Sequence, residues 1–320
     1  MQPIITLTAN PSIDKNASVD HIVAERKLRC GPPSYEPGGG GINVARAIHK
    51  LGGVAAALYL AGGPAGETLR RLLGEEGIEQ HVVPTEGWTR ENFIAYETAT
   101  GQQYRFGMPG AAVQEGEWQH SLEMLGTMDP APAYVVVSGS LPPGVPEDFC
   151  ARVVRRTRRW GARAIVDTSG AALREALRAR AYVLKPNVGE LAALVGHDIT
   201  GEAELEAIAM QLVSEEQCEV VVVSLGAGGA LLATAEGPRR LHAPVVPVQS
   251  KVGAGDSMVA GLALMLARGR PVLEAAQFGV AAGAAAVMTP GTELCRRDDA
   301  ERLFEQMRTG NMDAAEEGAR

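Results

Sequence analysis

Short apolar runs alternate with segments of helical spacing along most of the 320-residue chain, and this alternation is its main structural signal. The apolar runs predict strands at residues 3–8, 54–61, 80–83, 134–137, 164–166, 182–184 and 219–224. The helical spacing predicts helices at residues 42–48, 66–76, 114–125, 146–160, 171–179, 188–194 and 202–214. Because Val221-Val222-Val223 is too apolar for a half-exposed strand, we expect the sheet to be covered on both faces. The pattern predicts an α/β fold with a mostly parallel sheet flanked by helices.

A second group of β segments is shorter and more polar. Residues 92–98 and 102–106 flank Ala99-Thr100-Gly101, which is typical of a hairpin. Two further β pieces are expected between Ala17 and Tyr35, while Asn10 to Asp14 is predicted to be a turn. These polar segments are expected to stand off the main core.

Composition limits the classes of function. The formal net charge of −8 disfavours binding to nucleic acid or to an anionic membrane surface. No basic segment followed by a long apolar stretch opens the chain, so we expect no signal peptide and a cytoplasmic protein. No linker, repeat or low-complexity block divides the sequence. A single domain over residues 1–320 is therefore expected, with a disordered tail at 309–320.

The turn Gly253-Ala254-Gly255-Asp256 precedes the apolar helical run that starts at Met258. A glycine-rich turn that enters a helix points free backbone N–H groups and the positive end of the helix dipole at one spot, which favours an anion such as phosphate. Asp256 has two interpretations. It is either the N-cap of the helix or a carboxylate base beside a phosphate site.

The run Gly38-Gly39-Gly40-Gly41 also precedes a helix. It lacks the third glycine and the later acidic residue of a dinucleotide fingerprint. A tight helix-entry turn is one interpretation. The other is a backbone surface that a small polar ligand approaches closely, with Asn43 as donor and acceptor.

Three further patterns each allow a structural and a functional interpretation. Asn187 and Glu190 have the spacing of a capping box, but both could also lie near a nucleotide-bound Mg²⁺. The glycines after Ser224 suit either a tight hairpin or the close approach of a ligand. Arg90 and Arg105, beside the polar hairpin, are either solvated charges or a bidentate phosphate clamp.

These pieces occur in this order in one family. The chain resembles the ribokinase-like (PfkB) carbohydrate kinases, and within them the ATP-dependent 6-phosphofructokinases. The matching stretches are residues 6–14, 36–47, 103–110, 138–145, 185–187 and 252–259, with Thr292 and Asp298-Asp299. The resemblance covers nearly the whole chain. It implies a Rossmann-like core, a small β-sheet lid at about 15–36 and 88–108, and a homodimer that pairs through the lids.

The resemblance also implies roles for individual residues. Asp256 would be the base, and the backbone of Gly253, Ala254 and Gly255 would be the anion hole for the γ-phosphate. Substrate binding is implied for Asp14, Lys27, Gly38, Gly39, Asn43, Arg90, Arg105 and Ser138. ATP binding is implied for Lys185, Asn187, Ser224, Gly226 and Gly229, with Glu190 acting on Mg²⁺ through water.

Some members of the family hold K⁺ near the nucleotide. The corresponding positions are Ser250, Val252, Ala286, Thr289 and Gly291. The chain departs from the closest relatives at Thr289 and Glu293, where Asn and Arg are expected, and at Val23, where a tyrosine contacts a regulatory ATP.

The implied reaction is phosphorylation of O1 of fructose 6-phosphate by ATP, which gives fructose 1,6-bisphosphate. Gly40 favours this substrate, because kinases of fructose 1-phosphate or tagatose 6-phosphate tend to carry lysine there. Those two sugar phosphates remain alternatives. A non-catalytic sugar-phosphate sensor is a third, which the intact stretch Gly253 to Asp256 disfavours.

Overall fold

The computed structural model describes residues 1–317, and side chains are described as far as Thr309. A large sheet contains nine strands: β1 (Ile4–Thr8), β4 (Ala56–Ala61), β5 (Glu79–Pro84), β8 (Tyr134–Ser138), β9 (Arg163–Asp167), β10 (Ala181–Leu184), β11 (Cys218–Ser224), β12 (Ala230–Thr234) and β13 (Gly237–Leu241). Their order is β13-β12-β11-β10-β9-β8-β1-β4-β5. All neighbouring strands from β11 to β5 are parallel, which confirms the predicted α/β fold.

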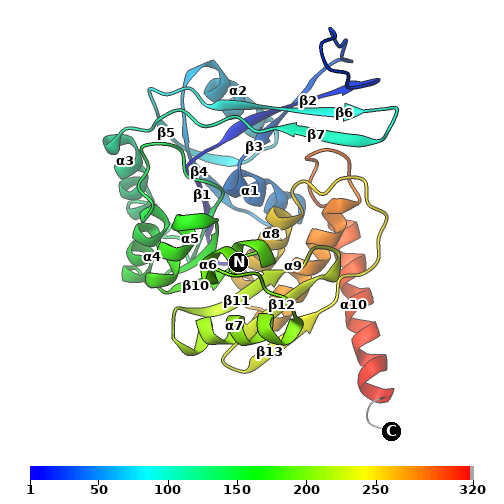
Figure 1. Ribbon diagram of the computed structural model, residues 1–320. Helices are drawn as coiled ribbons and strands as arrows, with labels where there is room; N and C mark the ends of the chain where they lie inside the picture. The colour runs from blue at the N-terminus through cyan, green and yellow to red at the C-terminus, as the bar shows by residue number, and fades with distance from the viewer. Residues whose placement is uncertain (318–320) are drawn as a thin grey trace.

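Two groups of helices cover the two faces of this sheet (Figure 1). One face carries α1 (Gly40–Lys50), α2 (Gly63–Glu75), α8 (Ala254–Ala267), α9 (Val272–Val287) and α10 (Arg297–Glu317). The other carries α3 (Glu115–Gly126), α4 (Phe149–Arg159), α5 (Gly170–Arg178), α6 (Val188–Val195) and α7 (Glu202–Ser214). Strand side chains alternate between the two cores, so Val136 packs on the first group while Val135 and Val137 pack on the second. This double burial explains why the strands are almost entirely apolar.

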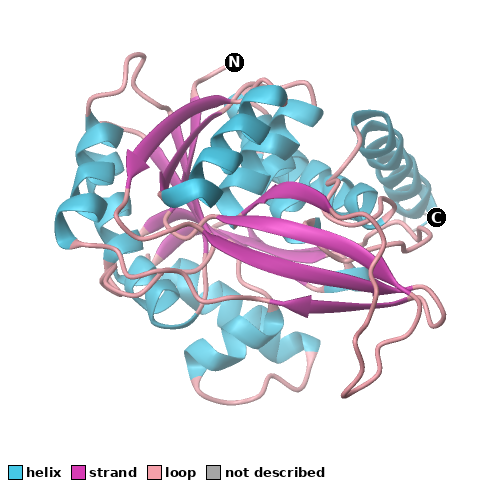
Figure 2. Cartoon of the chain, turned by 90° about the horizontal axis from the view of Figure 1, so that it is seen from above, coloured by secondary structure: helices cyan, strands magenta, loops and turns pink. Residues whose placement is uncertain are grey.

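A smaller four-stranded sheet lies apart from the large one (Figures 1 and 2). It contains β2 (Ser12–Val19), β3 (Ser34–Gly38), β6 (Arg90–Glu97) and β7 (Gln102–Phe106), in the order β3-β2-β6-β7. We call this sheet the lid. β2 and β6 are parallel, and β3 and β7 pair antiparallel on either side.

Three parts of the sequence interpretation differ from the structure. The predicted turn at Asn10 to Asp14 is wrong from Ser12 onward, because β2 begins there and pairs with both β3 and β6. The antiparallel strands β12 and β13 were not among the predicted strands, although the hairpin interpretation of the glycines after Ser224 implies a strand at β12. They follow from the short connection after β11, which is too short for a parallel crossover. The tail also differs, since α10 continues to Glu317, whereas residues 318–320 lie outside the described residues.

The strand order reverses at β1, which lies between β8 and β4. Ligands of such sheets bind beyond the carboxyl ends of the strands at this reversal. Within the described residues, no helix has the length and apolar character needed to cross a membrane.

Candidate active site

A polar cavity of about 310 Å³ lies between the lid and the ends of the core strands. Ten predicted site residues line it: Asp14, Gly39, Asn43, Arg90, Arg105, Ser138, Glu190, Val252, Gly253 and Asp256. Seven lining residues had no predicted role: Ser12, Asn92, Gly139, Ser140, Asp167, Thr168 and Ser169. Segments far apart in sequence therefore meet at one place.

The N-terminus of α8 forms one wall of the cavity. Its N-cap is Gly253, with φ of 74° and no side-chain cap bond, so the interpretation of Asp256 as the N-cap is wrong. Glycine is required at position 253 for two reasons. Its positive φ favours glycine, and an added Cβ would lie 2.5 Å from Cδ2 of Leu294. The free N–H groups of this first turn and the helix dipole make the wall suitable for an anion.

Asp256 lies in the first turn of α8 and reaches the cavity. Desolvation by the surrounding protein, reinforced by the negative charge of Asp167, raises the pKa of Asp256 to about 6. A hydrogen bond from Asn43 and the charges of Lys185 and Arg105 oppose this rise. A carboxylate with this pKa is a stronger base than an ordinary aspartate and is still ionised at neutral pH.

Asn43 connects α1 to Asp256. Its Nδ2 donates to Oδ2 of Asp256 at 2.9 Å. Its Oδ1 is buried and has no partner among the described residues. Because a buried acceptor without a partner is costly, this oxygen is suited to accept a hydrogen bond from a ligand hydroxyl.

Asp14 projects into the cavity from β2. Its Oδ1 accepts from Ser12 Oγ at 2.8 Å and from Asn92 Nδ2 at 2.8 Å. Asn92 lies directly opposite Asp14 on β6. Neither partner had a predicted role, because the turn predicted at Asn10 to Asp14 implies no regular spacing between Ser12 and Asp14. With the strand in place, the period of two places Ser12 on the same face as Asp14.

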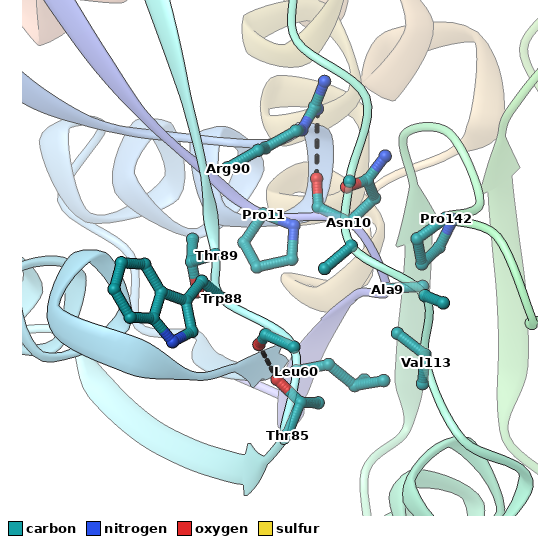
Figure 3. A pocket seen from close by; sticks show the side chains of 14 residues that line it. Ala9, Asn10, Pro11, Leu60, Thr85, Trp88, Thr89, Arg90, Val113 and Pro142 are labelled. Carbon is teal, nitrogen blue, oxygen red and sulfur yellow. Dashed lines mark hydrogen bonds between the residues drawn. The ribbon is translucent and has the colours of Figure 1, made fainter.

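Arg90 and Arg105 line the cavity from adjacent lid strands. Arg90 donates to the carbonyl of Asn10 at 3.1 Å (Figure 3) and to that of Met108 at 3.0 Å. Burial lowers the pKa of Arg90, and the charge of Asp14 opposes this change. Nε of Arg90 is buried without a partner among the described residues, so the guanidinium retains a free donor for an anion.

Lys27 does not join this cluster. It lies in the exposed connection between β2 and β3 and does not line the cavity.

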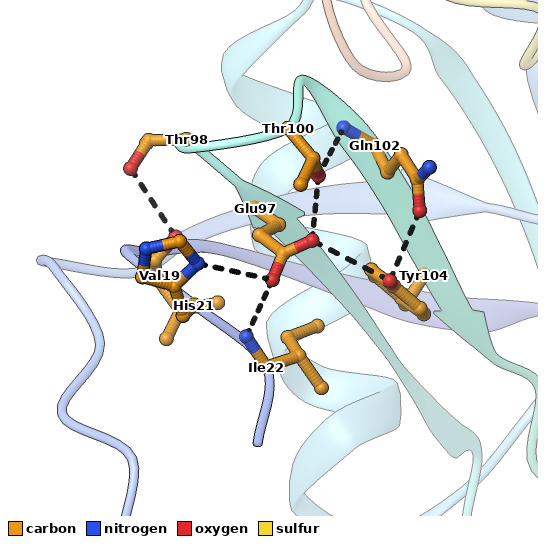
Figure 4. Close-up of polar contacts among 8 residues, drawn as sticks. All are labelled: Val19, His21, Ile22, Glu97, Thr98, Thr100, Gln102 and Tyr104. Carbon is orange, nitrogen blue, oxygen red and sulfur yellow. Dashed lines mark hydrogen bonds and ion pairs between the residues drawn. The ribbon is translucent and has the colours of Figure 1, made fainter.

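Glu97, at the end of β6, fixes the start of this connection (Figure 4). It accepts hydrogen bonds from the backbone N–H of Ile22 at 2.6 Å and from Thr100 Oγ1 at 2.5 Å. The bonds from Thr100 and Ile22 lower the pKa of Glu97.

Asp167 and Ser138 line the cavity from the ends of core strands, and Lys185, which does not line it, contacts Asp167. Asp167, at the end of β9, forms an ion pair with Lys185 at 2.9 Å and accepts from Ser138 Oγ at 3.3 Å. Burial alone would lower the pKa of Lys185, but Asp167 outweighs it and the net shift is upward. Lys185 is therefore cationic, and its Nζ lies 3.7 Å from where a Cβ at Gly255 would stand. Asp167 had no predicted role because no motif marks the end of β9, although the carboxyl ends of parallel strands meet at one edge of the sheet.

Asn187 and Glu190 form the capping box of α6. Asn187 Oδ1 accepts from the N–H of Glu190, and Glu190 Oε2 accepts from the N–H of Asn187, both at 2.8 Å. The structural interpretation is thus confirmed, yet Glu190 also lines the cavity. Within the described part of the chain, no three His, Cys, Asp or Glu side chains lie close enough together to hold a metal ion between them. Glu190 therefore offers Mg²⁺ a single carboxylate of the oxygen type that this ion prefers.

Ser224, Gly226 and Gly229 lie at the turn between β11 and β12 and do not line the cavity. Ser224 is bridged to Asn187, so the turn lies beside the start of α6. Gly229 has φ of 91°, and an added Cβ would lie 2.0 Å from the carbonyl oxygen of Leu241. The hairpin interpretation therefore accounts for this glycine by itself.

The positions expected to hold K⁺ come together from two segments. The N–H groups of Gln249 and Ser250 donate to the carbonyl of Val287, next to Ala286 at the end of α9. Thr289 is buried, and its hydroxyl lies 2.8 Å from the carbonyl oxygen of Ala286 and 2.9 Å from that of Leu294. The threonine thus organises carbonyl oxygens, the type of ligand that hard cations take.

A phosphate-binding helix N-terminus, a carboxylate of raised pKa and arginines around one polar cavity are typical of enzymes that transfer a phosphoryl group to an alcohol. Comparison with known families gives the specific group. Residues 7–299 match the model of the pfkB family carbohydrate kinases, and the chain belongs to this family.

Curated relatives match over most of their length. The ATP-dependent 6-phosphofructokinase isozyme 2 of Mycobacterium tuberculosis is 46% identical, with 94% of this chain and 89% of that protein aligned. The Escherichia coli protein of the same name is 44% identical, with 95% and 98% aligned. A 1-phosphofructokinase of Xanthomonas campestris is 36% identical over 82% of this chain and 83% of that protein.

Solved structures agree with this relationship. The chain superposes on Escherichia coli phosphofructokinase-2 in complex with potassium with a TM-score of 0.93 and 42% identity, covering 96% of this chain and all of that one. The same enzyme in complex with fructose-6-phosphate gives a TM-score of 0.91 at 42% identity, with the same coverage. A ribokinase of Thermotoga maritima shares the fold at 22% identity and a TM-score of 0.76.

Proposed function

We propose that this enzyme transfers the γ-phosphoryl group of ATP to O1 of fructose 6-phosphate. The observation that carries the proposal is the cavity, in which two lid arginines face a carboxylate at a helix N-terminus. The end with the lid arginines suits the phosphate of a sugar phosphate, and the end at the helix N-terminus suits the phosphoryl group that is transferred. The identity of 44–46% with 6-phosphofructokinases supports this substrate.

The lid would hold the sugar phosphate. Arg90 and Arg105 bind its phosphate group, and Ser138 lies on the core side of the same cavity. Asp14, fixed by two hydrogen bonds, and Asn43, with its unpartnered Oδ1, accept from sugar hydroxyls. Gly39 lets the sugar approach the backbone closely.

Asp256 would act as the general base. It takes the proton from the O1 hydroxyl as O1 bonds to the γ-phosphorus and the bond from phosphorus to the β,γ-bridging oxygen breaks, which releases ADP. The N–H groups of Gly253, Ala254 and Gly255 stabilise the charge on the transferring oxygens. Lys185 adds positive charge beside this anion hole.

ATP would lie on the side of the cavity where α6 and the β11–β12 turn begin, with Asn187, Ser224, Gly226 and Gly229 near it. Mg²⁺ bound with ATP would neutralise phosphate charge, and Glu190 would reach it through water. Ser250, Val252, Ala286, Thr289 and Gly291 would hold K⁺, mainly through carbonyl oxygens.

A homodimer that pairs through the lids is part of the proposal. Tyr35 and Phe106 are large apolar side chains left exposed on the lid, and they lie in one cross-strand row with Lys15 and Phe93. Exposed apolar side chains of this kind suit contact with a second copy of the chain. Escherichia coli phosphofructokinase-2 has a tetrameric inhibited form. We further propose a cytoplasmic location, where both substrates occur.

An ADP-release assay with a panel of sugars and sugar phosphates, with Mg²⁺ and with or without K⁺, tests the function. We expect the highest kcat/KM with fructose 6-phosphate. Preference for fructose 1-phosphate or tagatose 6-phosphate would replace the substrate assignment. Binding of a sugar phosphate without ADP release would identify a sensor instead of a kinase.

A further inference from the structure

Arg46 is a charged side chain that the proposed mechanism does not use. It lies on α1, is only 4% exposed and does not line the cavity. Its Nε donates to both carboxylate oxygens of Glu76 at 3.0 and 2.8 Å, and its Nη2 donates to Oε1 at 2.7 Å. Its Nη1 donates to the carbonyl of Pro37 at 3.0 Å. Arg46 thus connects its own helix, α1, to the end of α2 and to the lid strand β3.

Pro37 is the last residue before the glycine run that joins the lid to the core. The run has no free space around it. An added Cβ would lie 2.7 Å from Asp14 Oδ1 at Gly38, 2.9 Å from Thr8 Cγ2 at Gly39 and 2.3 Å from Ser138 Oγ at Gly40. Because the run packs directly on two predicted substrate-binding side chains, a shift of Pro37 displaces them too.

The same arginine lies one turn after Asn43, whose amide donates to Asp256. Its surroundings are acidic. Burial, opposed by Arg46 and reinforced by Asp14, raises the pKa of Glu36, with Glu76 adding to the rise. Arg46 is therefore the positive charge that balances this group of carboxylates. The Arg46 side chain is 5% exposed and that of Glu76 is 30% exposed, so loss of Glu76 would leave a buried and unpaired positive charge, which is costly.

We propose that Arg46 is a positioning residue of the sugar site. Its bonds to Glu76 and Pro37 fix the glycine run and, through it, hold Asp14 and Ser138 in register with Asn43 and Asp256. This inference rests on the proposed function, because it assigns the cavity to a sugar phosphate.

Arg46→Lys tests the idea, because lysine keeps the charge but loses the planar fork that reaches both partners. We expect KM for the sugar phosphate to rise about fivefold, as for the loss of one hydrogen bond of average strength. KM for ATP and kcat should change less than about threefold. Glu76→Gln, which keeps the shape but weakens the pair, should give the same selective change and provides a second variant if Arg46→Lys does not fold.

The matched control is Arg71→Lys. Arg71 forms an exposed ion pair with Glu75, the residue that precedes Glu76. Substitution of Arg71 should leave both KM values unchanged. A lower melting temperature of Arg46→Lys and Glu76→Gln with both KM values unaltered would overturn the proposal and leave a purely structural ion pair. The assay uses whichever sugar phosphate the wild-type enzyme phosphorylates. Failure of the fructose 6-phosphate assignment is therefore visible in the wild type and separate from the behaviour of Arg46.

Discussion

The two halves of the cavity are prepared in different ways. On the lid, hydrogen bonds fix positions, since Asp14 is held by two side chains and Arg90 by two backbone carbonyls. On the core, burial and neighbouring charges tune Asp256, with Asp167 raising its pKa while Lys185, and Arg105 from the lid, oppose the rise. The lid is thus built for binding and the core for chemistry. Loss of a lid arginine should mainly change KM, and loss of Asp256 should mainly change kcat.

The largest expected effect is at the core. Asp256→Asn removes the base, so kcat should fall by roughly 10³-fold or more, within the range known for catalytic groups. KM for the sugar phosphate should change little, because asparagine still fits beside Asn43. Steady-state kinetics measure both constants, and circular dichroism checks the fold. A fall in kcat of less than about tenfold would remove Asp256 from the role of base.

The lid arginines should give the opposite result. Arg90→Ala or Arg105→Ala removes a charge-assisted contact worth about 2–3 kcal/mol, so KM for the sugar phosphate should rise about 30- to 150-fold. KM for ATP should remain within a few fold of wild type. Unchanged sugar KM in both variants would contradict the phosphate clamp.

How much of this the sequence could predict differs between the two halves. The core follows from local signals, because apolar strands and glycine-rich helix starts are visible along the chain, as at Gly253 to Asp256. The lid depends on pairing between distant segments. Asn92 donates to Asp14 only because β6 pairs with β2, and the sequence around either residue does not indicate this pairing. Asp167 was predictable in principle, since it ends a strand of the parallel sheet.

The pH dependence of kcat/KM tests whether the ionised Asp256 is the base. Asp256 must be ionised to accept a proton, so kcat/KM should fall tenfold per pH unit below its pKa of about 6. The substrate phosphate also titrates at a pKa of about 6, so the wild-type profile alone does not assign the limb. Arg105 lowers the pKa of Asp256. Arg105→Ala should therefore move the limb to higher pH, whereas a limb that belongs to the substrate stays in place.

The smallest expected effect concerns stability. The pKa of Asp256 is raised from 3.8 to about 6 by folding, so its contribution to stability is fully present below pH 3.8 and is lost as pH rises through about 6. At pH 8 the wild type therefore carries a penalty of about 1–3 kcal/mol that Asp256→Asn lacks. Urea unfolding should show the variant to be more stable at pH 8, and this advantage should shrink toward pH 4.5. If the variant and the wild type differed in unfolding free energy by the same amount at both pH values, the charge of Asp256 would not be the source of the difference. The contrast between a core tuned by charge and a lid fixed by hydrogen bonds would then be wrong.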